Sequence, residues 1–501
     1  MNAFNLIMDL GTWAQAHPLE VAVGAIAVPA VMTLGTLMLR GQPGGGSTVH
    51  GSARWALPAE VRQAGFYTRH GVVLGRLGGR LLCDDGEGHV LLVGPTRSKK
   101  GVGVIIPTLL TWLGSALVLD PKDGENYDVT ARWRRWVARN RICYFTPCRS
   151  PHTRINVGDA IRFKTVREFG DAHTISQSLT APEKMIKENS TSVHFRELAA
   201  LLLTASQLHV GYTTGRCSLA ATWAFLTQYY KNLSGCLRAM RTTQHTSHGV
   251  HRAVMTLSNA VKNITGEREL GSVWSTAIRP LVLYNDPLIA KSTDSSSFDF
   301  NDFQYGPQPL SLYMVAPSPR ALERLHPLYR VVLDVGMARL MEHKVRTWKH
   351  RLLLCGDELP MHGYIHAVDK GAADMAGYGI KGLFVGQDVP QFEDAYGEEP
   401  SLWGNTHVKI FHTPENDLTA HRIAEKLLGD RTVTHPVEQR QLGLAGRRSV
   451  QYQQTGRSLL THDEVGELPD HLEIVRVGGM KPLLVEKIDY RDDPAFRRLA
   501  A

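Results

Sequence analysis

The sequence predicts an α/β protein with a mostly parallel, doubly wound sheet, a helical segment inserted into it and a membrane-spanning helix before it. Three observations predict this class: short apolar runs alternate with helical patterns, a glycine-rich turn separates one such run from a helix, and an uncharged apolar stretch stands near the N-terminus. The strand-like runs are 90–93, 116–119, 310–315, 352–356, 382–386 and 407–411.

Length and composition set the first bounds. A chain of 501 residues exceeds the usual size of one domain and predicts two or three structural units. With 43% hydrophobic and 21% charged residues, it has the composition of a globular protein rather than a disordered or fibrous one. The net charge of +8 favours an anionic partner, either nucleic acid or the inner membrane surface. The six cysteines form no CxxC pair, so neither a zinc site nor a disulfide framework is indicated.

The N-terminal segment predicts a membrane anchor. Val21 to Leu39 carries no charge and is about as long as a helix that crosses the hydrocarbon core. No basic residue precedes it, unlike a secretory signal, and Arg40 follows it. The positive-inside rule therefore predicts a single-pass protein with its N-terminus outside and everything after Arg40 in the cytoplasm. Residues 4–16, which Asp9 interrupts, are interpreted as an interfacial helix. The alternative for 21–39 is a buried core helix.

A candidate phosphate-binding loop follows the run 90–93. Backbone N–H groups in such a loop cradle phosphates, and Lys100 stands where a lysine reaches the β and γ phosphates of ATP. The pattern GxxxxGK[ST] is broken twice, because Lys99 replaces a glycine and Gly101 replaces the hydroxyl that binds Mg²⁺. The candidate nucleotide-binding residues are Gly94, Thr96, Arg97, Ser98, Lys99, Lys100, Gly101 and Val102.

Lys99 makes impaired nucleotide binding a second expectation. Glycine in these loops adopts conformations that cost other residues roughly 1–3 kcal/mol, and a lysine side chain there can crowd the phosphates. The alternative interpretation of the whole segment is an ordinary basic turn between a strand and a helix.

Two further strand ends carry candidate catalytic groups. Asp357 and Glu358 follow the run 352–356, the arrangement of a Walker B motif. We assign Asp357 to Mg²⁺, directly or through water, and Glu358 to polarising the attacking water. Gln387 follows the run 382–386 and is a candidate sensor of the γ-phosphate. The alternatives are a solvated strand end for the acidic pair and a surface glutamine for Gln387.

Five blocks of sequence together resemble the TraG-like family of type IV secretion coupling proteins. A sixth block, SLLTHDEVGELPD at 458–470, resembles that family's C-terminal tail. The five blocks are HGSARWA at 50–56, GPTRSKKGVGVIIPTLLTW at 94–112, VLDPKDGENYDVTA at 118–131, LLLCGDELPMHG at 352–363 and MAGYGIKGLFVGQDVPQ at 375–391.

The resemblance implies a protein of the bacterial inner membrane. Its cytoplasmic part would have a RecA-like nucleotide-binding domain with an inserted all-α domain and would assemble as a homohexamer around DNA. It also implies partners, namely a relaxase bound to single-stranded DNA and the components of the secretion channel. The helical pattern from about 163 to 298 matches the position of the insert. The division that follows is a membrane anchor at 1–40, the nucleotide-binding domain at 41–162 and 299–501 with the tail, and the helical insert at 163–298.

Three departures from the family limit what carries over. The family usually has glycine at the position of Lys99, whereas its TraG-like branch shares Gly101. Many members have two spans, and one is clear here. Ring ATPases of this kind borrow a basic residue from the adjacent subunit, but no arginine lies between Glu358 and Gln387, which leaves Lys370 or Lys381 as substitutes.

Three functions remain open from the sequence. The first is a coupling ATPase that uses ATP and Mg²⁺ to move relaxase-bound single-stranded DNA into the channel. The second, motivated by Lys99, is a receptor of the same channel that hydrolyses ATP weakly. The third is a chromosome-segregation translocase with a similar core.

Overall fold

The computed structural model describes residues 48–149, 153–184, 190–230, 232–262, 266–342, 347–440 and 448–501. The predicted span 21–39 and the predicted interfacial helix 4–16 lie outside these ranges. Within them, no helix is both long and apolar enough to cross a membrane. The described residues form two compact units, one within Ala56–Leu427 and Thr461–Ala501, the other within 48–55 and Leu428–Leu460. The division predicted from the sequence, with boundaries at 162 and 298, stays a prediction.

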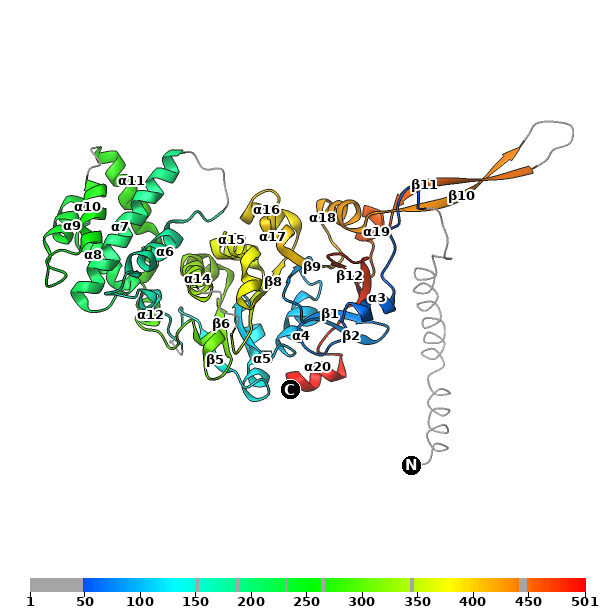
Figure 1. Cartoon of the computed structure of the whole chain (residues 1–501), viewed down its shortest axis with the longest axis horizontal. Helices are drawn as coiled ribbons and strands as arrows, with labels where there is room; N and C mark the ends of the chain where they lie inside the picture. Colours follow the sequence, from blue (N-terminus) through cyan, green and yellow to red (C-terminus); the bar gives the residue numbers. More distant parts are fainter. Residues whose placement is uncertain are drawn as a thin grey trace, which may run out of the picture. The chain divides into compact units, whose positions relative to one another are not determined.

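The larger unit is built on one sheet of eleven strands in the order β2-β1-β13-β12-β9-β3-β8-β7-β4-β6-β5 (Figure 1). The strands are β1 Val72–Leu77, β2 Arg80–Asp84, β3 His89–Val93, β4 Ser115–Asp120, β5 Arg141–Phe145, β6 Leu310–Val315, β7 Leu352–Gly356, β8 Ile380–Gly386, β9 Thr406–Phe411, β12 Leu472–Val477 and β13 Leu483–Glu486.

The sheet is mixed rather than parallel throughout. Every neighbouring pair from β9 to β5 is parallel, and these strands include all the runs predicted from the sequence. The pairs from β2 to β9 through β1, β13 and β12 are antiparallel. The first and last strands of the chain thus meet at one edge, a pairing that local periodicity does not predict.

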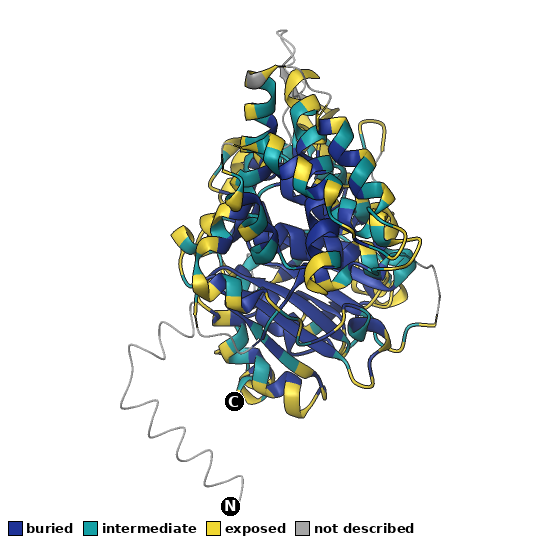
Figure 2. Cartoon of the chain, turned by 90° about the vertical axis from the view of Figure 1, so that its left-hand side faces the viewer, coloured by how far each residue is buried: buried dark blue, intermediate teal, exposed yellow. Residues whose placement is uncertain are grey.

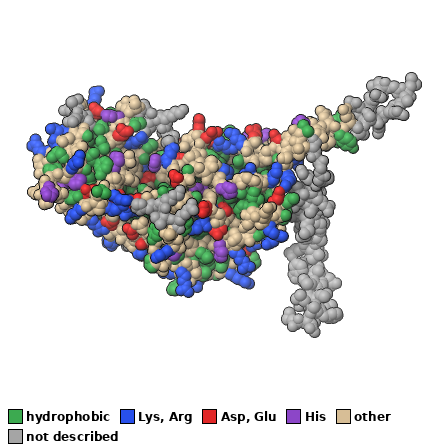
Figure 3. Space-filling model, viewed as in Figure 1, with side chains coloured by type: hydrophobic (Ala, Val, Ile, Leu, Met, Phe, Trp, Pro, Cys, Tyr) green, Lys and Arg blue, Asp and Glu red, His purple; other side chains and the backbone are tan. Residues whose placement is uncertain are grey.

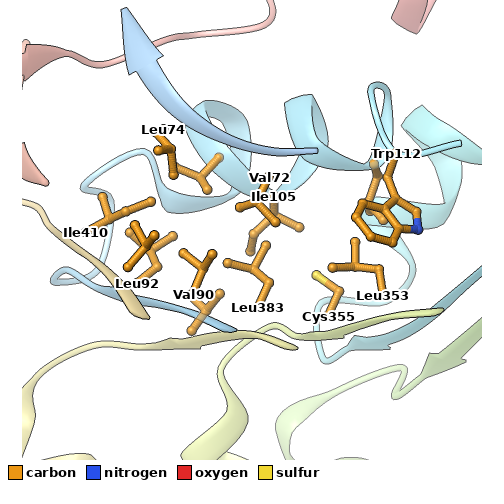
Figure 4. Packing of buried hydrophobic residues seen from close by; sticks show 14 of the residues in the cluster. Val72, Leu74, Val90, Leu92, Ile105, Trp112, Leu353, Cys355, Leu383 and Ile410 are labelled. Atoms are coloured by element: carbon orange, nitrogen blue, oxygen red, sulfur yellow. The ribbon is translucent and has the colours of Figure 1, made fainter. Parts of the chain in front are cut away.

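The central parallel strands are buried along their whole length, as expected for a sheet covered on both faces. Figure 2 shows these strands in dark blue, with exposed residues on the helices around them. On one face, Val90, Leu353 and Leu383 lie in a single apolar cluster with Ile105 and Trp112 (Figure 4). This packing holds the helix that follows the candidate phosphate loop against the sheet.

The helical elements of this unit outside the inserted segment are mostly short. They are α3 Pro58–Gln63, the π-helix η1 Gly101–Ile105, α4 Ile106–Leu109, α5 Glu125–Trp136, α13 Asp302–Tyr305, α14 Pro319–Leu340, η4 Leu359–His362, α15 His366–Met375, η5 Ala376–Tyr378, α16 Val389–Tyr396, α17 Ser401–Asn405, α18 Asp417–Arg422, η6 Ile423–Leu428, α19 His462–Gly466 and α20 Pro494–Ala500.

Arg134 of α5 fixes the end of α4 and is fully buried. Its guanidinium donates to the carbonyls of Leu109, Trp112 and Gly114 at 2.6–3.0 Å. It also donates to Ser311 Oγ and to an oxygen of the neighbouring Asn140 side chain. One side chain therefore satisfies carbonyls that the helix end leaves open.

A helical segment lies between β5 and β6, as the sequence pattern predicts. Its elements are η2 Val157–Ala160, α6 Glu168–Thr180, α7 Ser190–Thr214, α8 Leu219–Gln228, α9 Leu233–Thr242, α10 Arg252–Lys262, α11 Glu267–Ile278, η3 Arg279–Asn285 and α12 Pro287–Ser292.

Helix α14 joins this segment to α15, the helix that follows the acidic pair and η4 in the chain. The buried carboxylate of Asp334 accepts from Ser178 Oγ of α6 at 2.5 Å and from the Ala367 amide of α15 at 2.9 Å. Arg330 donates to the carbonyl of Pro182 at 2.9 Å. The Tyr364 amide donates to the Glu183 carbonyl at 2.8 Å. The chain that leaves α6 is therefore held by two hydrogen bonds, one from Arg330 and one from Tyr364.

The smaller unit contains an antiparallel hairpin, β10 Asp430–Arg440 and β11 Arg448–Ser458. At its base, the Ala53 amide donates to the Asp430 carbonyl at 2.9 Å. Part of the block at 50–56 is thereby a partner of this hairpin, which the sequence did not predict.

Candidate functional site

The predicted site residues stand at the carboxyl ends of neighbouring parallel strands. The loop that begins at Gly94 follows β3, Gln387 follows β8, and Asp357 and Glu358 follow β7. Asp120 ends β4, the next strand. Parallel strands present these ends at one edge of a sheet, which is where α/β folds bind ligands.

Lys100 connects the loop to the acidic pair. Its side chain is 5% exposed, and its ammonium donates to the carbonyls of Gly94 and Pro95 at 2.6 and 3.0 Å. The same nitrogen lies 3.4 Å from Glu358 Oε1. Burial lowers the pKa of Lys100, and the nearby Glu358 carboxylate opposes that effect. The structure thus joins the two motifs through one ion pair.

The acidic cluster contains carboxylate oxygens that have no protein partner. Asp357 Oδ2 accepts from Asn126 Nδ2 at 3.2 Å and lies 3.8 Å from the Lys122 ammonium. Among the described residues, the buried atoms Asp120 Oδ1, Asp357 Oδ1 and Glu358 Oε2 have no hydrogen-bond partner. Buried polar atoms are rarely left so, and their grouping indicates a place for a ligand.

Burial dominates the electrostatics of this cluster. It raises the pKa of Asp357, and it raises the pKa of Asp120 to about 7, with the Asp357 charge adding to the shift. Glu358 has a left-handed backbone with φ of 50°. A non-glycine residue in this region is strained and is typical of functional sites.

The residues present fit Mg²⁺ bound together with nucleotide phosphates. Mg²⁺ in such sites takes one or two carboxylates, with phosphate oxygens and water as its other ligands. In the part of the chain that is described, no three or more His, Cys, Asp or Glu side chains are arranged to hold a metal by themselves. The unpartnered oxygens of Asp357 and Asp120 can supply the one or two carboxylate ligands that Mg²⁺ takes when phosphates and water supply the rest.

Lys99 does not lie over the loop as a crowding side chain. Its φ of 76° is the left-handed conformation that favours glycine. Its ammonium extends to the C-terminal segment, 3.6 Å from Asp489 Oδ2, and the side chain is 47% exposed. Thr96 and Arg97 are also exposed, whereas Gly101 and Val102 begin the π-helix η1.

Gln387 lies next to the start of the loop. The Gly94 amide donates to the Gly386 carbonyl at 3.2 Å, which ties the tip of β8 to the loop. The Gln387 amide donates to Gln391 Oε1 at 2.9 Å, and Asp388 caps the helix that follows. The half-buried side chain of Gln387 is therefore at the edge where the other motifs meet.

Sequence reasoning missed several neighbours of the site. Asp120, Lys122 and Asn126 all belong to the block at 118–131, which carries the family resemblance but contains no motif with a chemical role of its own. His412 Nδ1 and Ser98 Oγ share a hydrogen bond of 3.1 Å. The other ring nitrogen of His412, Nε2, lies 2.8 Å from Glu473 Oε2. No local pattern marks His412, because it reaches the loop only through the pairing of β9 with β3.

Lys370 and Lys381 are the two lysines suggested as a basic group for an adjacent subunit. For Lys381 this prediction is wrong. Its side chain is fully buried, and its ammonium donates to Asp84 Oδ2 at 2.7 Å and to the carbonyls of Gly86 and Gly88. A group held in this way cannot reach another chain. Lys370 has an exposed side chain beside Asp369 and stays a prediction.

Comparisons with known proteins show the family of this chain. A family model described as type IV secretory system conjugative DNA transfer matches residues 54–500. A conjugal transfer protein TraG of Escherichia coli is 30% identical and aligns over 99% of this chain and 86% of its own length. Protein VirD4 of Agrobacterium fabrum strain C58 is 26% identical, over 90% of this chain and 67% of its own.

The solved structures that resemble this fold include the plasmid coupling protein TrwB in complex with ADP and Mg²⁺. It superimposes with a TM-score of 0.61 over 92% of this chain and 99% of its own, at 15% identity. TrwB in complex with a non-hydrolysable GTP analogue gives a TM-score of 0.60 at 16% identity. This chain is therefore a member of the type IV secretion coupling proteins of conjugative DNA transfer, with the fold of the plasmid coupling protein TrwB.

Proposed function

We propose that this coupling protein hydrolyses ATP with Mg²⁺ at the carboxyl edge of its parallel strands. In this proposal, the hydrolysis powers delivery of relaxase-bound single-stranded DNA to the type IV secretion channel. The observation that carries the proposal is the meeting of Lys100 with Glu358, 3.4 Å apart, beside carboxylate oxygens that lack protein partners. Groups of this kind bind phosphates and Mg²⁺ and activate water.

Each residue has a role that follows from its position. Lys100 holds the β and γ phosphates once its ammonium leaves the Gly94 and Pro95 carbonyls. Asp357 binds Mg²⁺, directly or through water, and Asn126 orients that carboxylate. Glu358 accepts a proton from, or orients, the attacking water. The bound Mg²⁺ neutralises charge on the phosphate oxygens.

Gln387 and the backbone of the loop complete the proposed site. Gln387 senses the γ-phosphate from the tip of β8, and the N–H groups from Gly94 to Val102 cradle the phosphates. TrwB in complex with ADP and Mg²⁺ shares this fold, which supports the choice of cofactors.

We extend the proposal to the surroundings of the protein. The net charge of +8 suits single-stranded DNA, and Figure 3 shows Lys and Arg side chains over both the helical segment and the sheet region of the visible face. The apolar segment 21–39 anchors the chain in the inner membrane, and six copies form the ring that surrounds the DNA. Carbonate extraction of membranes and the mass of the detergent-solubilised assembly test these two points.

The decisive experiment replaces the proposed catalytic carboxylate. The full-length chain with Glu358→Gln, purified in detergent, is expected to lose about 100-fold or more in kcat for ATP hydrolysis measured with single-stranded DNA. Glu323→Gln, an exposed carboxylate on α14, is the matched control and leaves kcat unchanged. Donor cells carrying each variant are compared for transfer frequency. Turnover by the Glu358 variant equal to that of the parent would refute the proposal.

The weakly hydrolysing receptor is the second candidate, because Lys99 departs from the glycine of the loop. It requires that Lys99→Gly restores tight ATP binding and DNA transfer that the parent lacks. Tight ATP binding by the parent excludes it. The chromosome-segregation translocase predicts a segregation defect in place of a transfer defect when the gene is deleted.

A further inference from the structure

The C-terminal segment from Lys487 to Asp493 lies against the helix that starts at the phosphate loop. The Tyr490 amide donates to the Val102 carbonyl at 3.1 Å. Gly103 approaches the Ile488 carbonyl so closely that a Cβ there would stand 2.7 Å from its oxygen. Ile488 is 3% exposed and packs in one apolar cluster with Ile106 and Leu110. The segment is therefore a fixed neighbour of the loop.

Asp489 of this segment is built to hold a cation. Its side chain is 7% exposed, so it is more buried than its partner Lys99. Arg491 donates to it from Nε at 2.8 Å, from Nη2 at 2.6 Å and from its amide at 3.1 Å. These hydrogen bonds hold the pKa of Asp489 below its usual value. Asp489 is thus a charged, oriented acceptor that lies 3.6 Å from the Lys99 ammonium.

We infer that Asp489 is a positioning residue that keeps the charge of Lys99 away from phosphates bound in the loop. Lys99 directly precedes Lys100, so an ammonium released from Asp489 would stand within about one Debye length, 8–10 Å, of those phosphates. A second lysine charge there would strengthen binding of the anionic product as well as of the substrate. The ion pair lets a lysine replace the glycine while the loop still releases ADP.

Because it concerns nucleotide phosphates, this inference rests on the proposed function, and the experiment separates the two. ADP with Mg²⁺ is titrated calorimetrically into the full chain, the Asp489→Asn variant, Lys99→Gln and the double variant. Asp489→Asn is expected to bind ADP about threefold more tightly than the parent, and to lower KM and kcat for ATP together. In the Lys99→Gln background, most of this gain disappears, because no ammonium is released.

Asp492→Asn is the matched control, since it removes a carboxylate charge from the same segment at an exposed position that makes no ion pair with Lys99. It leaves the ADP affinity unchanged. The inference is overturned if Asp489→Asn binds ADP no more tightly than the parent, or if its gain persists undiminished with Lys99→Gln. A residue that only supported the fold would raise KM and lower Tm instead. A parent that binds no ADP refutes the proposed function and this role of Asp489 with it.

Thermal unfolding of the same four proteins without nucleotide reports on the ion pair separately. If the pair exists, the loss of Tm caused by Asp489→Asn is larger with Lys99 present than with Lys99→Gln. If Asp489→Asn lowers Tm equally in the two backgrounds, the ion pair between Lys99 and Asp489 is refuted.

Discussion

The ammonium of Lys100 lies 3.4 Å from Glu358 Oε1, so the lysine of the phosphate loop is held by the carboxylate proposed to activate water. Both side chains are almost fully buried, and the lysine also donates to two loop carbonyls. Under the proposed function, nucleotide phosphates compete with Glu358 for the same ammonium. The ion pair would then couple phosphate binding to release of the carboxylate proposed to activate water.

Removal of the Glu358 charge should separate binding from turnover. In Glu358→Gln, Lys100 loses a competing anion, so we expect ATP to bind several-fold more tightly than in the parent while hydrolysis is lost. Equilibrium titration with a fluorescent ATP analogue measures the dissociation constant. Glu323→Gln again serves as the control with unchanged affinity. Weaker binding in Glu358→Gln would show that the carboxylate holds the loop in its binding conformation.

The stability of the larger unit should depend on pH through Asp120. Burial raises the pKa of this carboxyl from 3.8 in the unfolded chain to about 7, so folding favours its protonated form. The resulting stability is present below pH 4 and is lost as the pH rises to about 7. Asp120→Asn avoids the cost of burying the charge, so its Tm should exceed that of the parent by a few degrees at pH 8 and by less at pH 5.5. A constant difference across this range would contradict the assignment.

Arg134 should be irreplaceable even by lysine. Its guanidinium donates to the carbonyls of Leu109, Trp112 and Gly114, and lysine cannot reproduce that fork of donors. We expect Arg134→Lys to lower the free energy of unfolding by roughly 3 kcal/mol, because buried carbonyls lose their partners. Its exposed neighbour provides the control, since Arg135→Lys should change little. Chemical denaturation followed by tryptophan fluorescence distinguishes the two.

Lys381 should contribute to the stability of the fold, whereas Lys370 should not. Lys381→Met leaves the Asp84 carboxylate buried without its cation, which costs about 3–5 kcal/mol. The same change at Lys370, whose side chain is 55% exposed, should leave Tm unchanged. Adding Asp84→Asn to Lys381→Met should recover part of the loss. If Lys370→Met instead lowers ATP hydrolysis at unchanged Tm, Lys370 is supported as the basic group given to an adjacent subunit.

Asp334 should connect the helical segment to α15. Asp334→Ala removes the acceptor of Ser178 Oγ and of the Ala367 amide, at a cost of about 1–3 kcal/mol for each group left unsatisfied. Hydrogen exchange should then quicken at the C-terminal end of α6 and the start of α15. Asp374→Ala, an exposed acid on α15, is the matched control. Unchanged exchange at both places would show that α14 holds them without this carboxylate.

The sequence by itself determined the order and nature of the motifs. Each apolar run predicted as a strand is one, because uninterrupted branched residues such as those of β3 and β7 suit a sheet buried on both faces. It also placed Lys100 in the loop that follows one strand and Asp357 and Glu358 directly after another, and the parallel order of those strands brings their carboxyl ends together. The long blocks in a fixed order identified the family, which the comparisons confirm.

The tertiary structure alone decided which groups touch. The antiparallel edge joins β1 and β2 to β12 and β13 across most of the chain, and β9 brings His412 to the loop. Lys381 is one of the two lysines suggested as a basic group for an adjacent subunit, but its side chain is fully buried and pairs with Asp84. The sequence predicts that the Lys99 side chain crowds phosphates in the loop, but its ammonium lies beside Asp489 instead. Local periodicity reports which face of an element is apolar, whereas ion pairs between residues distant in sequence depend on how the elements pack.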